Sequence, residues 1–261
     1  MSDPNSSALE QDSHHLNLNP QPEPPGFEMS TAETLTSIFF EPSRVFEALR
    51  ARPRFLAAGL ILIALTVLVT VLLFQKVDFT EFMRERLANS PQAAQMTEEQ
   101  KERTTRMAKI ALQFLPPISL AVIFAAGAGL YLLGVMAMGK SITYKQALAV
   151  WVYSSFPPGI ITGVLSIIMI FIKSADQIDL TRPGGNLLVT NPSALMGEGT
   201  SRMLLAALAS FDLLKLYGMF LAALGLRKVA RLSSGAAWAI VLGIWLLGTL
   251  LSVAGAAFGG R

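Results

Sequence analysis

Cysteine is absent from this chain of 261 residues, and histidine occurs only twice. Without cysteine the protein has no disulfide, no thiolate metal site and no cysteine nucleophile. Both histidines, His14 and His15, lie in a polar N-terminal segment, where an incidental pair is a better interpretation than a metal site. We therefore expect no catalytic site, no metal and no cofactor that depends on these two residue types.

Charged residues are also scarce. They make up 15% of the chain, whereas 52% of the residues are hydrophobic and the mean hydropathy is +0.49. A soluble domain carries about 25% charged residues, and here the charges gather between long uncharged runs, as in membrane proteins. Nucleic-acid binding is not expected, because the net charge is only +3 and the basic residues form no single stripe.

The N-terminal residues 1–37 are predicted to be a disordered tail. They are rich in Pro, Ser, Asn and Gln, contain acidic residues and have neither Lys nor Arg, so they cannot bury enough apolar surface to offset the ordering entropy. A basic start and an apolar core are missing, which excludes a signal peptide. The more apolar stretch 32–40 is a candidate for a short interfacial helix.

Five apolar runs are long enough to cross a bilayer as helices. About twenty helical residues match a hydrocarbon core of ~30 Å, and lipid forces the backbone to satisfy its own hydrogen bonds. The predicted fold is all-α: a polytopic bundle of five transmembrane helices, with a helical loop after the first span. The spans are expected at about 55–74, 116–138, 147–172, 203–226 and 236–258.

The third predicted span contains Pro157 and Pro158 near its middle. Each proline removes a helix hydrogen bond, which predicts a kink. Hydroxyl side chains in the same helix can satisfy freed carbonyls, and we expect Ser154, Ser155 and Thr162 to do so.

The polar segment 76–115 predicts two amphipathic helices. The first, near 80–89, places Phe79, Phe82 and Met83 at helical spacing. The second begins at Thr97, with Gln100 three residues on in capping-box register. These helices either lie on the bilayer surface or pack over the bundle, and packing over the bundle is the favoured interpretation.

Basic residues indicate the orientation. With a cytoplasmic N-terminus, the short inside segments 44–54, 139–145 and 227–235 hold nine Lys and Arg residues. The other side holds eleven, but seven of these belong to the long segment 76–115. Short loops carry the orientation signal, so we predict the N-terminus inside and the C-terminus outside, in the cell (inner) membrane if the source is prokaryotic.

Asp212 and Lys215 are the only ionisable residues well inside a predicted span. Charges at membrane depth are costly and commonly functional, and a spacing of three lets the two side chains pair on one helix face. Two interpretations stay open: an ion pair that fixes helix packing, or a group that handles a transported solute or ligand.

An enzyme is not predicted. An intramembrane aspartyl protease needs two facing carboxylates, and a rhomboid-type protease needs a histidine at membrane depth. The EExxxR spacing at 98–103 lies in a polar helix, and the histidine motifs that accompany it in glutamate proteases are missing. No phosphate-binding glycine loop is present either.

Small residues recur at four-residue spacing in the fifth predicted span, at Ala239/Gly243 and Gly248/Ser252. This spacing permits close helix approach, either within one chain or in a dimer.

Three segments, taken in order, resemble one membrane-protein family. They are FEPSRVF at 40–46, with Leu49 and Pro53 after it; KQAL at 145–148, with YSSFP at 153–157; and FDLL at 211–214, with Gly225 and Leu226 ending the same span. This order is similar to that of the Yip-domain family of Ypt/Rab-interacting membrane proteins, in its prokaryotic type. The resemblance covers residues 38–258 and implies a five-span Yip-like domain with a cytoplasmic N-terminus. It also implies, by analogy with eukaryotic members, small-GTPase binding in vesicle traffic.

The leading functional hypothesis is a non-enzymatic membrane protein that organises or recruits partners. The expected partners are the lipid bilayer and other membrane proteins or a second copy. The alternative is a small permease or channel-like transporter that uses Asp212 and Lys215 beside the proline-bearing third helix. The candidate functional residues are Asp212, Lys215, Ser154, Ser155 and Pro157.

Overall fold

The computed structural model describes residues 29–88, 93–178, 187–197 and 199–258, and the regular structure in these ranges is entirely helical. Of the tail predicted to be disordered over residues 1–37, residues 1–28 lie outside the described residues, whereas Thr31–Ser37 form a helix because Ser30 and Glu33 make a capping box at its start. The helices are α1 Thr31–Ser37, α2 Pro42–Ala51, α3 Leu56–Lys76, α4 Phe79–Ala88, α5 Glu98–Ala137, α6 Tyr144–Ile172, α7 Arg202–Leu208, α8 Leu213–Val229 and α9 Ser234–Phe258. The predicted interfacial helix near 32–40 corresponds to α1 and the turn that follows it.

Four of these helices, α3, α5, α6 and α9, are long and apolar enough to cross a membrane. The pair α7 and α8, bent by 48°, completes a fifth crossing if it is counted as one span. With 17 residues, α8 alone is ~26 Å long, which is shorter than a ~30 Å hydrocarbon core. The all-α polytopic fold is confirmed, but the fourth span is not the continuous helix that the sequence predicted over 203–226.

The long helix α5 joins two elements that the sequence predicted as separate. Its 40 residues continue through Pro116 and Pro117, so the helix from Thr97 and the second span are one rod. The predicted capping box is present: the Gln100 N–H donates to Thr97 Oγ1 at 3.3 Å, and the Thr97 N–H donates to Gln100 Oε1 at 2.9 Å. At ~60 Å, α5 is about twice as long as the bilayer core is thick, so one half lies beyond it.

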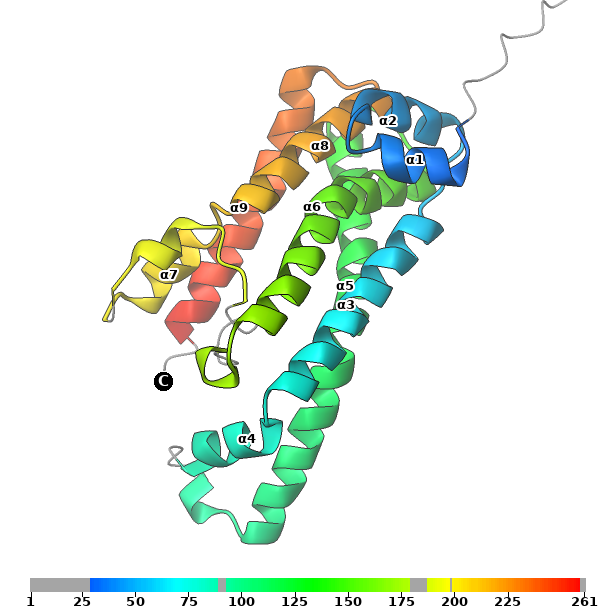
Figure 1. Cartoon of the computed structure of the whole chain (residues 1–261). Helices are drawn as coiled ribbons and strands as arrows, with labels where there is room; N and C mark the ends of the chain where they lie inside the picture. Colours follow the sequence, from blue (N-terminus) through cyan, green and yellow to red (C-terminus); the bar gives the residue numbers. More distant parts are fainter. Residues whose placement is uncertain (1–28, 89–92, 179–186, 198, 259–261) are drawn as a thin grey trace, which may run out of the picture.

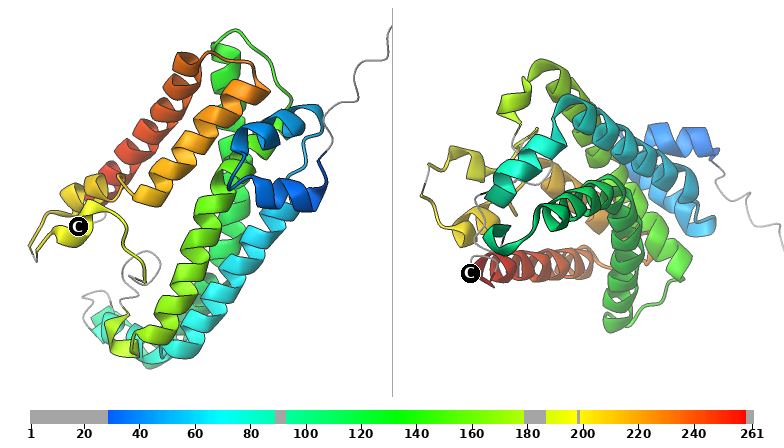
Figure 2. Two further views of the ribbon diagram at one scale, coloured as in Figure 1. Left: turned by 45° about the horizontal axis from the view of Figure 1, so that its top comes forward. Right: turned by 90° about the horizontal axis from the view of Figure 1, so that it is seen from below.

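The long helices form a bundle with two different ends (Figures 1 and 2). Helices α3, α5 and α6 contact one another, and α8 packs against both α6 and α9. At the upper end in Figure 1, α1 and α2 lie across the bundle and α2 contacts α6 and α8. Helices α4 and α7 lie toward the opposite end, where α4 contacts α5 and α7 contacts α9.

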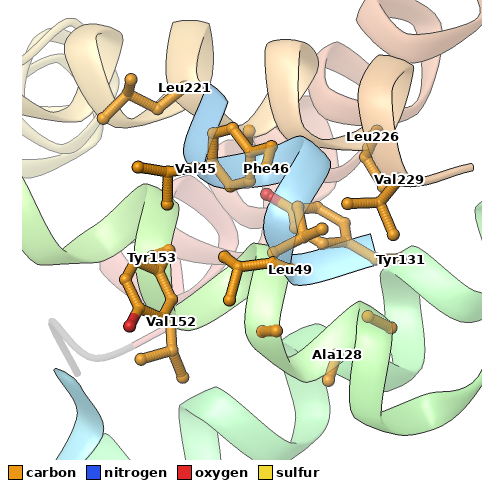
Figure 3. Close-up of a cluster of buried hydrophobic side chains, with 14 of the residues drawn as sticks. Val45, Phe46, Leu49, Ala128, Tyr131, Val152, Tyr153, Leu221, Leu226 and Val229 are labelled. Carbon is orange, nitrogen blue, oxygen red and sulfur yellow. The ribbon is translucent and has the colours of Figure 1, made fainter. Parts of the chain in front are cut away.

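The main hydrophobic core lies at the end that carries α1 and α2 (Figure 3). Most of its side chains come from α2, α5, α6 and α8, with others from α3 and α9, and the most buried include Phe46, Leu49, Val150, Tyr153 and Leu221. Much of the apolar surface of α3, α5 and α9 is exposed, as expected of helices that face lipid.

Candidate functional site

The N-terminal platform, which we define as α1 and α2 (residues 31–51), is inserted into the bundle end. Phe46 has no exposed surface, and its ring lies against Gly225 of α8. A Cβ atom at Gly225 would lie 2.8 Å from both Phe46 Cε1 and Val150 Cγ1, so only glycine leaves room for the ring. Pro42 at the start of α2 suits a helix N-terminus, where its missing N–H has no helical partner to lose.

Polar contacts also hold the platform on α6 and α8. Of these contacts the one between Tyr153 and Thr34 is buried, and a buried hydrogen bond is costly to break because the group left behind is cut off from water. The contacts join Tyr153 Oη to Thr34 Oγ1 at 3.1 Å, Gln146 Nε2 to the Arg50 carbonyl at 2.8 Å, and Lys228 Nζ to Glu47 Oε1 at 2.5 Å. The platform is therefore a fixed part of the membrane domain.

The hydroxyl groups near Pro157 do not make the bonds that the sequence predicted. The two prolines free the carbonyls of Tyr153 and Ser154, four residues before them. The Ser154 and Ser155 hydroxyls instead both donate to the Trp151 carbonyl at 2.9 Å. Pro157 is buried, and α6 stays one helix from Tyr144 to Ile172.

Helix α8 covers one of the carbonyls that the prolines free. A Cβ atom on Gly218 would lie 3.5 Å from the Ser154 carbonyl oxygen, so the two backbones approach closely there. Such contacts between a glycine Cα–H and a carbonyl oxygen recur at helix–helix interfaces. The neighbouring helix, rather than a hydroxyl of α6, therefore accommodates this carbonyl.

A groove lies between α3, α5 and α6, within the membrane-spanning part of the bundle. Its volume is about 810 Å³, and its walls include Ser155, which the sequence singled out, and Trp151. None of the residues lining it is charged. The α3–α5–α6 groove is thus an apolar site of a size that holds small molecules or hydrocarbon chains.

Asp212 lies at the break between α7 and α8 instead of inside a helix. It is the N-cap of α8, and its Oδ1 accepts from the Leu214 N–H at 2.9 Å and from the Lys215 N–H at 3.1 Å. Its Oδ2 accepts a hydrogen bond from the Thr190 hydroxyl, and the Thr190 carbonyl accepts from the Leu213 N–H at 3.1 Å.

The structure does not show the predicted ion pair of Asp212 with Lys215. Lys215 is exposed, and the salt bridges among the described residues do not include one between these two side chains. In the described ranges, no group of three His, Asp or Glu side chains comes together that could hold a metal ion.

The sequence matches a known family of membrane proteins over most of its length. The family model for the Yip1 domain matches residues 36–255, which is most of the chain. The chain belongs to the Yip1-domain family. Together with its apolar helices, this membership makes it a multi-pass integral membrane protein. No curated protein and no solved structure matches the chain.

The three segments that resemble the Yip1 family occupy different places in the structure. Residues 40–46 lie within the platform, residues 145–148 and 153–157 lie on α6 beside it, and residues 211–214 span the break before α8. The sequence did not predict the bond of Thr190 to Asp212 or that of Gln146 to Arg50, because both bonds join residues far apart in the chain. A glycine within an apolar run was the available signal for the contact at Gly225.

Proposed function

We propose that this Yip1-domain protein is a non-enzymatic membrane protein that organises or recruits partners at the bilayer, and that it uses the N-terminal platform to do so. The observation that supports the proposal is the insertion of Phe46 between α6 and α8, which ties the platform to the bundle. The acidic tail of residues 1–28 leads directly into this platform. A partner bound there would be held at a defined distance from the membrane.

The outer surface of the platform carries both charge and an apolar group. Arg44 Nη2 and Nη1 lie 3.3 Å from Glu33 Oε1 and Glu41 Oε2, respectively. The adjacent Phe40 is 85% exposed. An exposed aromatic ring beside charged groups is typical of the anchors on which binding surfaces are centred.

The platform end also carries the basic segments 44–54, 139–145 and 227–235. This supports a cytoplasmic platform and, for a prokaryotic source, a place in the cell (inner) membrane. Binding of small GTPases enters only by analogy with the family, and other membrane proteins or a second copy of the chain are equal candidates as partners.

Site-specific photocrosslinking tests the proposal. A photoreactive residue in place of Phe40 is expected to give a reproducible protein adduct in intact membranes. The matched control replaces Phe220, which is 52% exposed on α8 and is not part of the main core. Equal adducts at both positions, or no adduct at Phe40, would show that the platform does not bind a partner.

The alternative, a small permease or channel-like transporter, rests on the break between α7 and α8. Interrupted helices with a charged residue often form the substrate sites of transporters. Asp212→Asn is a clean test, because asparagine caps a helix as well as aspartate does while removing the charge. Unchanged solute flux in reconstituted vesicles, with the variant as stable as the parent, would remove the reason for this alternative.

A further inference from the structure

We infer that the α3–α5–α6 groove binds an acyl chain of a bilayer phospholipid, whose phosphate lies beside Lys109. The inference concerns a different part of the molecule from the platform, so it does not depend on the proposed function. It rests on the chemistry of the groove walls, on the shape of the groove and on the unpaired charge at its open end.

The groove offers a ligand few hydrogen-bond donors. Its polar lining consists of five hydroxyl groups and the indole N–H of Trp151, and three of the hydroxyl groups already donate to carbonyls of their own helices. The bonds run from Thr66 to Leu62 at 2.9 Å, from Ser155 to Trp151 at 2.9 Å and from Thr162 to Pro158 at 2.8 Å. A polar solute would lose its hydration there without replacement, whereas a hydrocarbon chain loses nothing.

The groove is closed at the end near the platform. A Cβ atom on Gly127 of α5 would lie 2.2 Å from the Trp151 ring, so α5 and α6 meet tightly at this level. The Trp151 and Tyr131 rings are 4.6 Å apart and complete the closure. A chain in the groove therefore ends against Trp151.

One side wall is made of leucine side chains of α3 that lie over glycines of α6. Cβ atoms on Gly159 and Gly163 would lie 2.7 Å from Leu62 Cδ2 and 2.3 Å from Leu65 Cδ2. Farther along, the lining continues through Leu73 and Phe79 toward α4. The groove thus extends from mid-membrane toward the end that carries α4.

Lys109 marks that end. It precedes the lining residues Leu112 and Pro116 by three and seven positions, so it lies on the same face of α5. The side chain is exposed, and the described part of the chain supplies it with no ion-pair or hydrogen-bond partner. An ammonium group one turn beyond an apolar groove is placed as a phospholipid requires, with the phosphate outside and the chain inside.

Quenching of Trp151 by lipids with brominated acyl chains tests the chain site. The full-length protein would carry Trp238→Phe and Trp245→Phe, so that Trp151 is the only tryptophan. In vesicles of brominated phosphatidylglycerol and phosphatidylcholine, Thr162→Phe should cut the quenching roughly in half, because the ring fills the groove. Val164→Phe, on the same helix but outside the groove lining, should leave it unchanged.

Equal quenching in both variants would overturn the proposal, since bulk lipid or a helix of a second copy would then be what meets Trp151. A second measurement needs no change of tryptophan. Phospholipid retained by the detergent-purified wild-type chain should fall in Thr162→Phe and stay constant in Val164→Phe. Equal amounts of retained phospholipid in the two variants would also contradict the proposed site.

The headgroup contact has its own test. Lys109→Gln should reduce the preference for brominated phosphatidylglycerol over phosphatidylcholine by about fivefold, which is the contribution expected of one lysine near an anionic lipid. Lys140→Gln removes an exposed lysine at the opposite end and should change nothing. A preference that both variants leave intact would exclude Lys109 from phosphate binding.

Discussion

At the scale of single residues, the molecule depends on a few positions where two backbones or a ring and a backbone approach closely. Phe46 and Gly225 are the clearest case, since the ring occupies the space that a side chain on α8 would need. Such complementary pairs are sensitive to one added methyl group, because a packed core gives way little.

Gly225→Ala should therefore lower the free energy of unfolding by about 1–3 kcal/mol, the usual cost of an overpacked site. Thermal unfolding in detergent, followed by tryptophan fluorescence, measures it. Gly243→Ala on α9 is the matched control, since no atom lies within 4 Å of its Cβ position. Equal effects of the two substitutions would show that Phe46 does not fill the space at Gly225.

The buried hydrogen bond between Tyr153 and Thr34 makes a second prediction at this scale. Tyr153→Phe should destabilise the protein by about 1 kcal/mol, because it leaves the Thr34 hydroxyl without one partner. A double-mutant cycle with Thr34→Val isolates the pair, and a coupling energy of about 1 kcal/mol is expected. Strictly additive effects would mean that the bond does not hold α1 on α6.

At the scale of elements, the apolar helices were predictable and their interruptions were not. An uncharged run of twenty residues must form a helix in lipid, because its backbone has no other hydrogen-bond partners there. The positions of α3, α6 and α9 therefore follow directly from the sequence. A proline does not decide so clearly where a helix begins or ends. Pro116 and Pro117 were expected to start a span, but α5 has helix on both sides of them, held by α4 on one side and by α3 and α6 on the other.

The break at Asp212 failed to show in the sequence for a related reason. Aspartate is a strong N-cap residue, yet within a long apolar run a charge is equally compatible with a continuous helix. The deciding contact comes from Thr190, which lies 22 residues earlier in a loop. Tertiary contacts of this kind leave no periodic signal, and for that reason Asp212 was predicted to lie inside a continuous helix.

The continuity of α5 can be measured, because the chain has no cysteine of its own. Spin labels on cysteines at positions 105 and 125 should be about 30 Å apart, since each helical residue adds 1.5 Å. A much shorter or broad distance distribution would indicate a hinge at the prolines. Labels at 147 and 167 on α6 give the matched distance across Pro157 and Pro158.

At the scale of the whole molecule, the two ends of the bundle differ in packing. The platform end is filled by the main core, whereas the described residues of the other end form a small cluster around Ile170, Ile178 and Leu187 and open into the α3–α5–α6 groove. A rigid end and an open end suit different tasks, so partner binding at the platform and lipid binding in the groove need not interfere.

Partner binding at a cytoplasmic platform and lipid binding at the opposite end require a chain that crosses the membrane five times. Labelling of single cysteines tests this topology. A membrane-impermeant maleimide should label Ser174→Cys, which follows α6, in intact cells. It should label Ser141→Cys and Ser234→Cys only after permeabilisation. Both lie next to helix ends that bond to the platform, since the start of α6 contacts Arg50 and the end of α8 contacts Glu47. If α7 and α8 formed a re-entrant loop instead of a span, position 234 would share the exposure of position 174. The turn into α9 packs in the main core through Ala230 and Leu232, together with the platform, and this contact is the physical reason to expect a full crossing.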